Sequence, residues 1–168
     1  ELQQLLIDSI TTLANAIDAR DPYTRGHSER VTEYSVMVGE KLGFEPEELE
    51  RLRYAALLHD IGKIRIPDHI LNKPGRLDDV EFEEMKRHPV YGVGIMLPVR
   101  AFRPLLPYML HHHERFDGMG YPDRKMGEEI PLPARIICVA DCFDAMTSDR
   151  PYRKGLPVDV AVEELHRF

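Results

Sequence analysis

Apolar residues recur along the chain with the spacing of helices. Within residues 24–42 they fall at Val31, Tyr34, Val38 and Leu42, three or four positions apart, which places them on one face of an α-helix. The strict alternation of apolar and polar residues that predicts a β-strand is absent from the sequence. We therefore predict an all-α fold, a compact bundle of about seven to eight helices.

Proline and capping residues mark where several helices begin or end. Pro46 suits the first turn of one helix. Asp78, followed three residues later by Glu81, resembles the capping box of a helix that carries His88 and ends at Pro89. The other helices are expected over residues 46–60, 90–97, 105–110, 134–146 and 156–168.

The first 20 residues form a separate amphipathic segment. A heptad-like stripe runs through Leu2, Leu6, Ser9, Leu13 and Ala16. We predict that residues 1–20 are a connecting helix that pairs with a second copy, giving a homodimer, or with a neighbouring domain, and that residues 21–168 form the main domain. The chain starts at Glu1 and stops within a helical pattern, so we expect a piece of a longer protein.

Composition narrows the class of protein. A chain of 168 residues is long enough to bury one core without disulfides. Its 43% apolar content, and the lack of an apolar run near the roughly 20 residues that span a bilayer, predict a soluble domain. A membrane anchor elsewhere in a longer protein stays open. The net charge of -7 argues against a groove for a nucleic-acid polymer.

Two cysteines, Cys138 and Cys142, lie four positions apart in a helical pattern without a second pair. We expect them to be reduced core residues of a cytoplasmic domain.

Histidine and aspartate stand at the ends of the apolar helices. A lone histidine is commonly a helix-end residue, and Asp60 could cap a turn, but Asp141 in an apolar helix needs a partner because burying a carboxylate costs several kcal/mol. Together the residues predict a divalent-metal site, and imidazole and carboxylate ligands suit iron, manganese, zinc or nickel. The predicted ligands are His27, His59, Asp60, His88, His112, His113 and Asp141, with His111 as an exposed neighbour.

Three ordered segments resemble the HD-GYP family: HDIGK at residues 59–63, HPVYG at 88–92 and HHERFDGMGYP at 112–122. The resemblance extends over residues 21–153. HD-GYP proteins are bacterial cyclic di-GMP phosphodiesterases, usually the output domains of signalling proteins. The resemblance therefore implies an HD-type helical bundle that hydrolyses cyclic di-GMP to linear pGpG, and onward to GMP, under control of an upstream sensor or receiver domain.

The resemblance also implies how the metals are held. One ion would be held by His27, His59, Asp60 and Asp141, and the other by Asp60, His88, His112 and His113. Asp60 would bridge two divalent ions, with iron or manganese favoured and zinc or nickel as alternatives. The nucleophile would be a metal-bridging hydroxide. Some relatives carry a glutamate four residues before the first ligand histidine that helps to bind a third metal; Tyr23 stands there in this chain, which argues against a third ion.

The sequence specifies the residues that contact the substrate less clearly than it specifies the metal ligands. Asp60 and Lys63 are the predicted catalytic residues; Lys63 would bind a phosphate oxygen, and the alternative is a surface lysine in a salt bridge. Arg150 and Arg153 match family positions that contact phosphate or guanine. Arg115 and Asp144 could orient ligands without binding metal themselves, and the alternative is a structural role. Tyr121 would stack on or bond to the nucleotide, while its loop could equally bind protein partners or be a solvent-facing turn.

Two other functions remain open at the level of sequence. The first is an HD-superfamily phosphohydrolase that acts on another nucleotide or cyclic dinucleotide. The second is a non-catalytic signalling domain that binds a cyclic dinucleotide. The presence of all seven predicted ligands favours catalysis.

Overall fold

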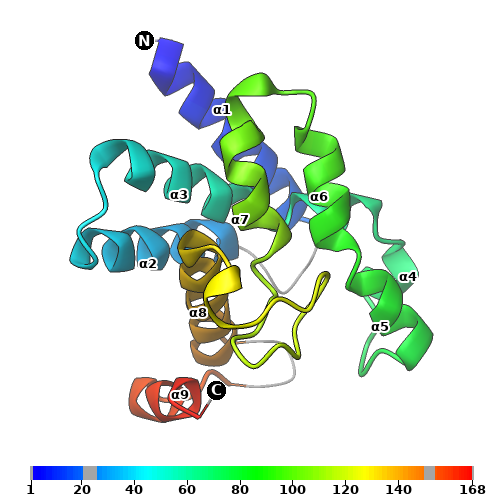
Figure 1. The fold of residues 1–168 in the computed structure, drawn as a ribbon. Coiled ribbons are helices and arrows are strands. Elements are labelled where there is room, and N and C mark those ends of the chain that lie inside the picture. The colour runs from blue at the N-terminus through cyan, green and yellow to red at the C-terminus, as the bar shows by residue number, and fades with distance from the viewer. Residues whose placement is uncertain (1, 21–25, 150–153, 168) are drawn as a thin grey trace.

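The computed structural model describes residues 2–20, 26–149 and 154–167, and these form helices without strands (Figure 1). The all-α prediction is confirmed. The α-helices are α1 (Leu2–Asp18), α2 (His27–Lys41), α3 (Pro46–Leu58), α4 (Asp68–Leu71), α5 (Asp79–Met85), α6 (His88–Met96), α7 (Leu106–Leu110), α8 (Leu132–Thr147) and α9 (Val158–Leu165). Three 3-10 helices accompany them: η1 (Ile61–Arg65), η2 (Arg100–Leu105) and η3 (Gly127–Glu129).

Helix boundaries follow the capping residues with one correction. In α5, the backbone N–H of Glu81 donates to Asp78 Oδ1 at 2.9 Å and that of Asp78 donates to Glu81 Oε2 at 2.8 Å, which confirms the capping box. His88, however, does not belong to that helix: it begins α6. Proline lacks an N–H and suits a first helical turn, so Pro89 opens α6 and does not close α5.

The main core lies between α2, α3, α7 and α8, which pack on one another. Each contributes a fully buried apolar side chain, among them Val31, Leu52, Met109 and Ile137. Burial of one such side chain stabilises the fold by about 1.5–3 kcal/mol. The core therefore fixes the four helices whose ends or faces carry most of the predicted ligands.

Helix α1 packs on α2 and α3 through Ile10, Ala14 and Ile17, which are buried. Three residues of its heptad stripe lie on another face: Leu13 is 52% exposed, and Ser9 and Ala16 are exposed as well. Pairing of this stripe with a second copy, and a division of the chain at residue 20, remain predictions.

The segment η1 packs closely against α6 (Figure 1). A Cβ atom on Gly62 would overlap the carbonyl oxygen of His88, so glycine is required at this approach. On its other side, the Arg20 guanidinium donates to three carbonyl oxygens of this region, the nearest that of Ile64 at 2.8 Å. Asp60, which directly precedes η1, is thereby fixed between α3 and α6.

Helix α8 presents its core face through residues such as Ile137 and leaves the cysteines on another face. Cys138 is half-buried and Cys142 is exposed, so the expected burial of both in the core was wrong for Cys142. Among the described residues, no helix has the length and apolar character needed to cross a membrane.

Candidate metal centre

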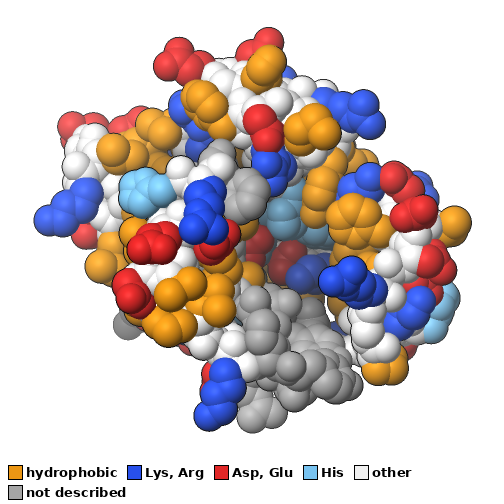
Figure 2. Space-filling view, turned by 90° about the horizontal axis from the view of Figure 1, so that it is seen from below, with side chains coloured by type: hydrophobic (Ala, Val, Ile, Leu, Met, Phe, Trp, Pro, Cys, Tyr) orange, Lys and Arg blue, Asp and Glu red, His pale blue; other side chains and the backbone are white. Residues whose placement is uncertain are grey.

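The seven predicted ligands come together from five helices. His27 and His88 are the first residues of α2 and α6, and His59-Asp60 directly follow α3. The pair His112-His113 lies just past α7, and Asp141 is in the middle of α8. Figure 2 shows histidine side chains at the bottom of a hollow, with acidic and basic side chains beside them.

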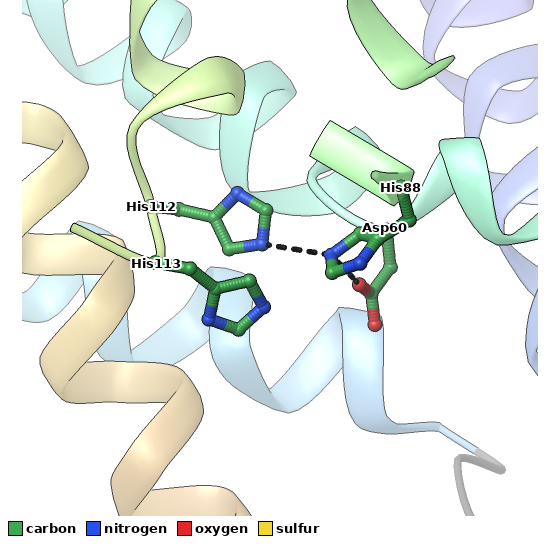
Figure 3. Close-up of side chains that lie close together, drawn as sticks. All are labelled: Asp60, His88, His112 and His113. Atoms are coloured by element: carbon green, nitrogen blue, oxygen red, sulfur yellow. Dashed lines mark hydrogen bonds and ion pairs between the residues drawn. The ribbon is translucent and has the colours of Figure 1, made fainter. Parts of the chain in front are cut away.

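Four of the ligands form one group, which we call the Asp60 group: Asp60, His88, His112 and His113 (Figure 3). His88 Nε2 lies 3.4 Å from His112 Nε2 and 3.2 Å from Asp60 Oδ1. Two atoms that bind one ion at about 2.1 Å lie roughly 3.0–3.4 Å from each other. The spacing in this group is therefore that of ligands around a shared cation.

The other three form the His27 group: His27, His59 and Asp141. His27 Nε2 lies 3.3 Å from Asp141 Oδ1. Asp60 Oδ2 faces this group, at 3.5 Å from His59 Nε2 and 4.0 Å from His27 Nε2, while Asp60 Oδ1 faces His88. The two oxygens of one carboxylate thus point at different groups, as a bridging ligand requires.

The backbone fixes the orientation of three imidazoles. The Nδ1 atoms of His59, His88 and His112 donate to the carbonyl oxygens three residues earlier, those of Ala56, Met85 and Met109, at 2.6, 2.8 and 2.7 Å. Each ring then presents Nε2 as an unprotonated acceptor. His59 Nε2 is buried and has no hydrogen-bond partner among the described residues. Such an atom is unfavourable unless a cation meets it, so the donor set fits divalent metals.

A carboxylate orients His27 instead. His27 Nδ1 donates to Asp144 Oδ2 at 2.7 Å, and Arg30 Nε donates to Asp144 Oδ1 at 2.5 Å. The sequence indicated that Asp144 could orient a ligand but did not reveal Arg30. Its signal is spacing: Arg30 lies three positions after His27, and Asp144 three after Asp141, so each pair shares a helix face.

The pKa values of the ligand side chains favour the protonation states that bind cations. Burial alone would raise the pKa of Asp60, but Lys63, His59 and His88 hold it well below its usual range. Burial lowers the pKa of His113 to about 3 and that of His112 well below its ordinary value. Ionised carboxylate and neutral imidazole are the forms that bind metals.

His27 behaves differently from the other histidines. Burial would lower its pKa, but hydrogen bonds with Asp141 and Asp144 raise that pKa to about 10. The same contact with His27, together with Arg30, lowers the pKa of Asp144 to about 2 against the effect of burial. A positive charge is thus stabilised between these two carboxylates.

Lys63 and Tyr121 lie beside the ligands. Lys63 Nζ is 2.6 Å from Asp60 Oδ2 and its side chain is largely buried, so it forms a salt bridge within the site and is not a surface lysine. The Tyr121 ring lies 4.9 Å from that of His113, centroid to centroid. Arg150, Arg153 and Tyr23 lie outside the described residues.

A cavity of about 590 Å³ opens next to His113 and Tyr121. Four basic residues line it: Lys86, Arg87, Arg115 and Arg124. The sequence did not single out this cationic border, because its residues come from two separate segments, one directly after α5 and the other in the loop after His113. Three of these four are ion-paired: Arg115 with Asp117 at 2.6 Å, Lys86 with Glu83 at 2.5 Å and Arg87 with Glu84 at 3.0 Å. Glu83 also lines the cavity.

One neighbour of the ligands was predicted wrongly. His111 is 7% exposed, not a solvent-facing residue. Glu114, on the other side of His112-His113, is 2% exposed. Both are buried because the loop that follows folds back over them: the backbone N–H of Asp123 donates to Glu114 Oε1 at 2.7 Å, and Asp123 Oδ2 lies 2.9 Å from His111 Nε2.

Fold and site together define an all-helical protein with two adjoining histidine and aspartate groups suited to divalent metals. The sequence profile of the HD domain family matches residues 11–167. The chain belongs to this family.

Several curated proteins are similar to the chain. It is 43% identical over 168 residues to the cyclic di-GMP phosphodiesterase response regulator RpfG of Xanthomonas campestris, covering 99% of this chain and 44% of that protein. It is 42% identical over 161 residues to the 3'3'-cGAMP-specific phosphodiesterase 3 of Vibrio cholerae, covering 94% and 35%. The chain thus spans less than half the length of these relatives.

Two solved structures share the fold. The cyclic GMP-AMP specific phosphodiesterase of V. cholerae matches with a TM-score of 0.55 and 37% identity, covering 94% of this chain and 35% of that one. An HDG"Y"P protein of Bdellovibrio bacteriovorus matches with a TM-score of 0.69 and 24% identity, covering 84% and 45%. The second likeness concerns the fold alone.

Proposed function

We propose that the chain is the catalytic part of a metal-dependent phosphodiesterase that hydrolyses cyclic di-GMP to linear pGpG and onward to GMP. The observation that carries this proposal is the convergence of seven histidine and aspartate side chains in two groups, with one oxygen of Asp60 facing each. The names of relatives such as RpfG support the substrate. Residues 21–168 would be the catalytic domain, and residues 1–20 would connect it to an upstream sensor or receiver.

Two divalent ions, iron or manganese by the donor set, would be held by the Asp60 group and the His27 group, with Asp60 shared. Bound divalent ions supply Lewis acidity, which acidifies water and offsets charge on phosphoryl oxygens. The chain's own task is to keep the ligands oriented. Backbone carbonyls do this for His59, His88 and His112, and Asp144 does it for His27.

The substrate would enter the cavity beside His113. Its volume of about 590 Å³ lies within the range of small-ligand sites. Lys86, Arg87 and Arg124 place positive charge on its border, which suits a dianionic cyclic dinucleotide. Tyr121, which lines the cavity next to His113, would stack on or bond to a base.

Lys63 would contact the scissile phosphate. Its ammonium group lies against Asp60 Oδ2, so it is already within the centre. A non-bridging phosphate oxygen could replace this carboxylate as its partner once Asp60 binds metal. Arg150 and Arg153 would add phosphate or guanine contacts, by resemblance to the family.

A second candidate substrate is 3'3'-cGAMP. The chain is 42% identical to a 3'3'-cGAMP-specific enzyme and 43% identical to a cyclic di-GMP enzyme, so identity does not separate them. The two nucleotides differ in one base. The residues that contact that base would decide which of the two is the substrate.

The test incubates protein of known metal content with each cyclic dinucleotide under reducing conditions. Fe²⁺ or Mn²⁺ is supplied, and the products are followed by chromatography. We expect cyclic di-GMP to be consumed with pGpG as the first product. The Asp141→Ala variant, purified in parallel, reveals any contaminating phosphodiesterase. If only 3'3'-cGAMP is cleaved, it replaces cyclic di-GMP as the proposed substrate. If both nucleotides bind and neither is cleaved, the chain is a signalling domain that only binds its ligand.

A further inference from the structure

A third cluster of metal-binding side chains lies outside the seven ligands. His111, Glu114 and Asp123 each offer one ligand atom, and these atoms lie within 4.8 Å of one another. His111 follows the last residue of α7, and Asp123 directly follows the Gly120-Tyr121-Pro122 turn. The cluster therefore joins the two ends of the loop that carries Tyr121.

The contact between His111 and Asp123 needs either a second proton on the imidazole or a metal ion. His111 Nδ1 lies 2.8 Å from the Pro107 carbonyl oxygen, which can only accept, so Nδ1 carries the proton. In the neutral ring Nε2 is then an acceptor, yet it faces Asp123 Oδ2 at 2.9 Å. Two acceptors at this distance need a proton or a metal ion between them. Ligands around a tetrahedral ion at about 2.1 Å lie about 3.4 Å apart, so an ion would widen this contact by about 0.5 Å.

Glu114 supplies a second and independent observation. Its residue is 2% exposed, and only one of its carboxylate oxygens is satisfied: Oε1 accepts from the backbone N–H of Asp123 at 2.7 Å. Oε2 is buried without a hydrogen-bond partner among the described residues. No lysine or arginine of the described part of the chain lies within ion-pair distance of Glu114 or Asp123. A buried, unpaired carboxylate oxygen is costly, and a cation would satisfy it.

We propose that His111, Glu114 and Asp123 form a separate site for a divalent transition metal of the zinc type. One imidazole nitrogen and two carboxylates are a donor set that suits Zn²⁺, and the half-exposed Asp123 leaves a coordination position for water. This site differs from the third ion that some relatives bind before the first ligand histidine, because it uses none of the seven ligands and no residue that precedes His27.

Such an ion would close the base of the Tyr121 loop. The loop already rests on His113, where the backbone N–H of Tyr121 donates to the His113 carbonyl oxygen at 3.1 Å. Gly120 lies so close to the backbone of Glu114 and Arg115 that a side chain there would overlap it. A metal that joins Glu114 to Asp123 would hold the loop, and with it Tyr121, against the main centre.

The test counts metal ions. Protein stripped by a chelator is dialysed against Zn²⁺, and bound zinc per chain is measured by mass spectrometry for the wild type, Asp123→Ala and His111→Gln. We expect each variant to bind one Zn²⁺ fewer per chain than the wild type. Asp117→Ala, a matched change on the same loop at another half-exposed aspartate, is expected to bind as many as the wild type.

A second readout reports on the loop. Addition of Zn²⁺ should slow hydrogen exchange of the amides in residues 114–126 more in the wild type than in Asp123→Ala, which keeps only the zinc of the main centre. Equal zinc content in all four proteins would overturn the proposal and leave a His111–Asp123 ion pair as the explanation of the contact. Because the count compares variants without substrate, it is decided independently of whether the chain cleaves a cyclic dinucleotide.

Discussion

The Asp60 group and the His27 group differ in how one histidine is oriented. In the Asp60 group, His88 and His112 donate to carbonyl oxygens of the backbone. In the His27 group, His59 does the same, but His27 donates to the side chain of Asp144, which Arg30 holds in turn. A backbone contact survives substitution of its residue, whereas a carboxylate can be removed by one mutation. The two groups should therefore fail separately, except where Asp60 joins them.

The largest effect is expected from Asp60→Ala. Because Asp60 Oδ1 faces His88 and Oδ2 faces His59, the substitution removes a ligand from both groups at once. We expect metal content to fall at both sites and hydrolysis to drop by at least on the order of 100-fold, since even residues that only orient ligands are worth 10- to 100-fold. Metal analysis and chromatography measure this, and circular dichroism should show the helices intact. Normal metal content with retained turnover would refute the assignment of Asp60.

Gly62→Ala should disturb the backbone-held group through the fold. The added methyl group would overlap the His88 carbonyl oxygen and push η1 away from α6. We expect the free energy of unfolding to fall by about 1–3 kcal/mol, the usual cost of overpacking. Metal binding at Asp60 and His88 should weaken as well. Denaturant unfolding and metal titration measure the two effects.

Gly94→Ala is the matched control for Gly62→Ala. Gly94 also lies in α6, but a methyl group there meets no atom within 4 Å. Alanine should therefore stabilise the helix by about 0.5–1 kcal/mol. Equal effects of the two substitutions would mean that the contact between η1 and α6 does not position the site.

The same contrast explains what the sequence could predict. Ligands at helix ends next to Pro or Gly, such as His59 and His88, were visible because punctuation and apolar spacing mark those ends. Two supporting residues were harder to find: Arg30, which holds Asp144, and Arg20, which holds the backbone after Asp60, act on partners more than 40 positions away. Spacing shows that Arg30 shares a helix face with His27, but it does not show which distant residue that face meets.

The burial of individual residues was also difficult to predict from the sequence. His111 was expected at the surface because nothing near it in sequence covers it, but Asp123 closes over it from beyond the loop. Conversely, Val38 and Leu42 continue the apolar pattern of α2 and are exposed, while Ser35 and Gly39 are buried against α3 and its neighbours. Small residues permit close helix packing there. A helix face that is predicted from large apolar residues alone leaves these small residues out.

Asp144→Asn should affect one group and spare the other. Asparagine has one acceptor oxygen where Asp144 uses two, and it lacks the negative charge, so it cannot accept from both His27 and Arg30 as Asp144 does. We expect the ion at the His27 group to bind about 10- to 100-fold more weakly, while the Asp60 group keeps its affinity. Isothermal titration with Mn²⁺ should then resolve one weakened and one unchanged site. Equal weakening of both would mean that the groups are coupled beyond Asp60.

The smallest effect is expected from Asp78→Ala, which tests how firmly the backbone holds His88. Asp78 caps α5, and the last residue of α5, Met85, supplies the carbonyl oxygen that accepts from His88 Nδ1. Loss of the cap should cost about 1 kcal/mol of stability. Asp79→Ala, one position further into the same helix, loses no capping bond and should cost only a few tenths of a kcal/mol.

Metal affinity should change less than about threefold in Asp78→Ala, because fraying is confined to the first turn of a helix. The C-terminal end of α5 is held separately: Met85 packs against the small cluster of Ile66, Ile70 and Leu71. A larger loss of affinity, absent from Asp79→Ala, would show that the backbone-held group depends on the whole of α5. In that case the Asp60 group would be no more robust than the group that relies on Asp144.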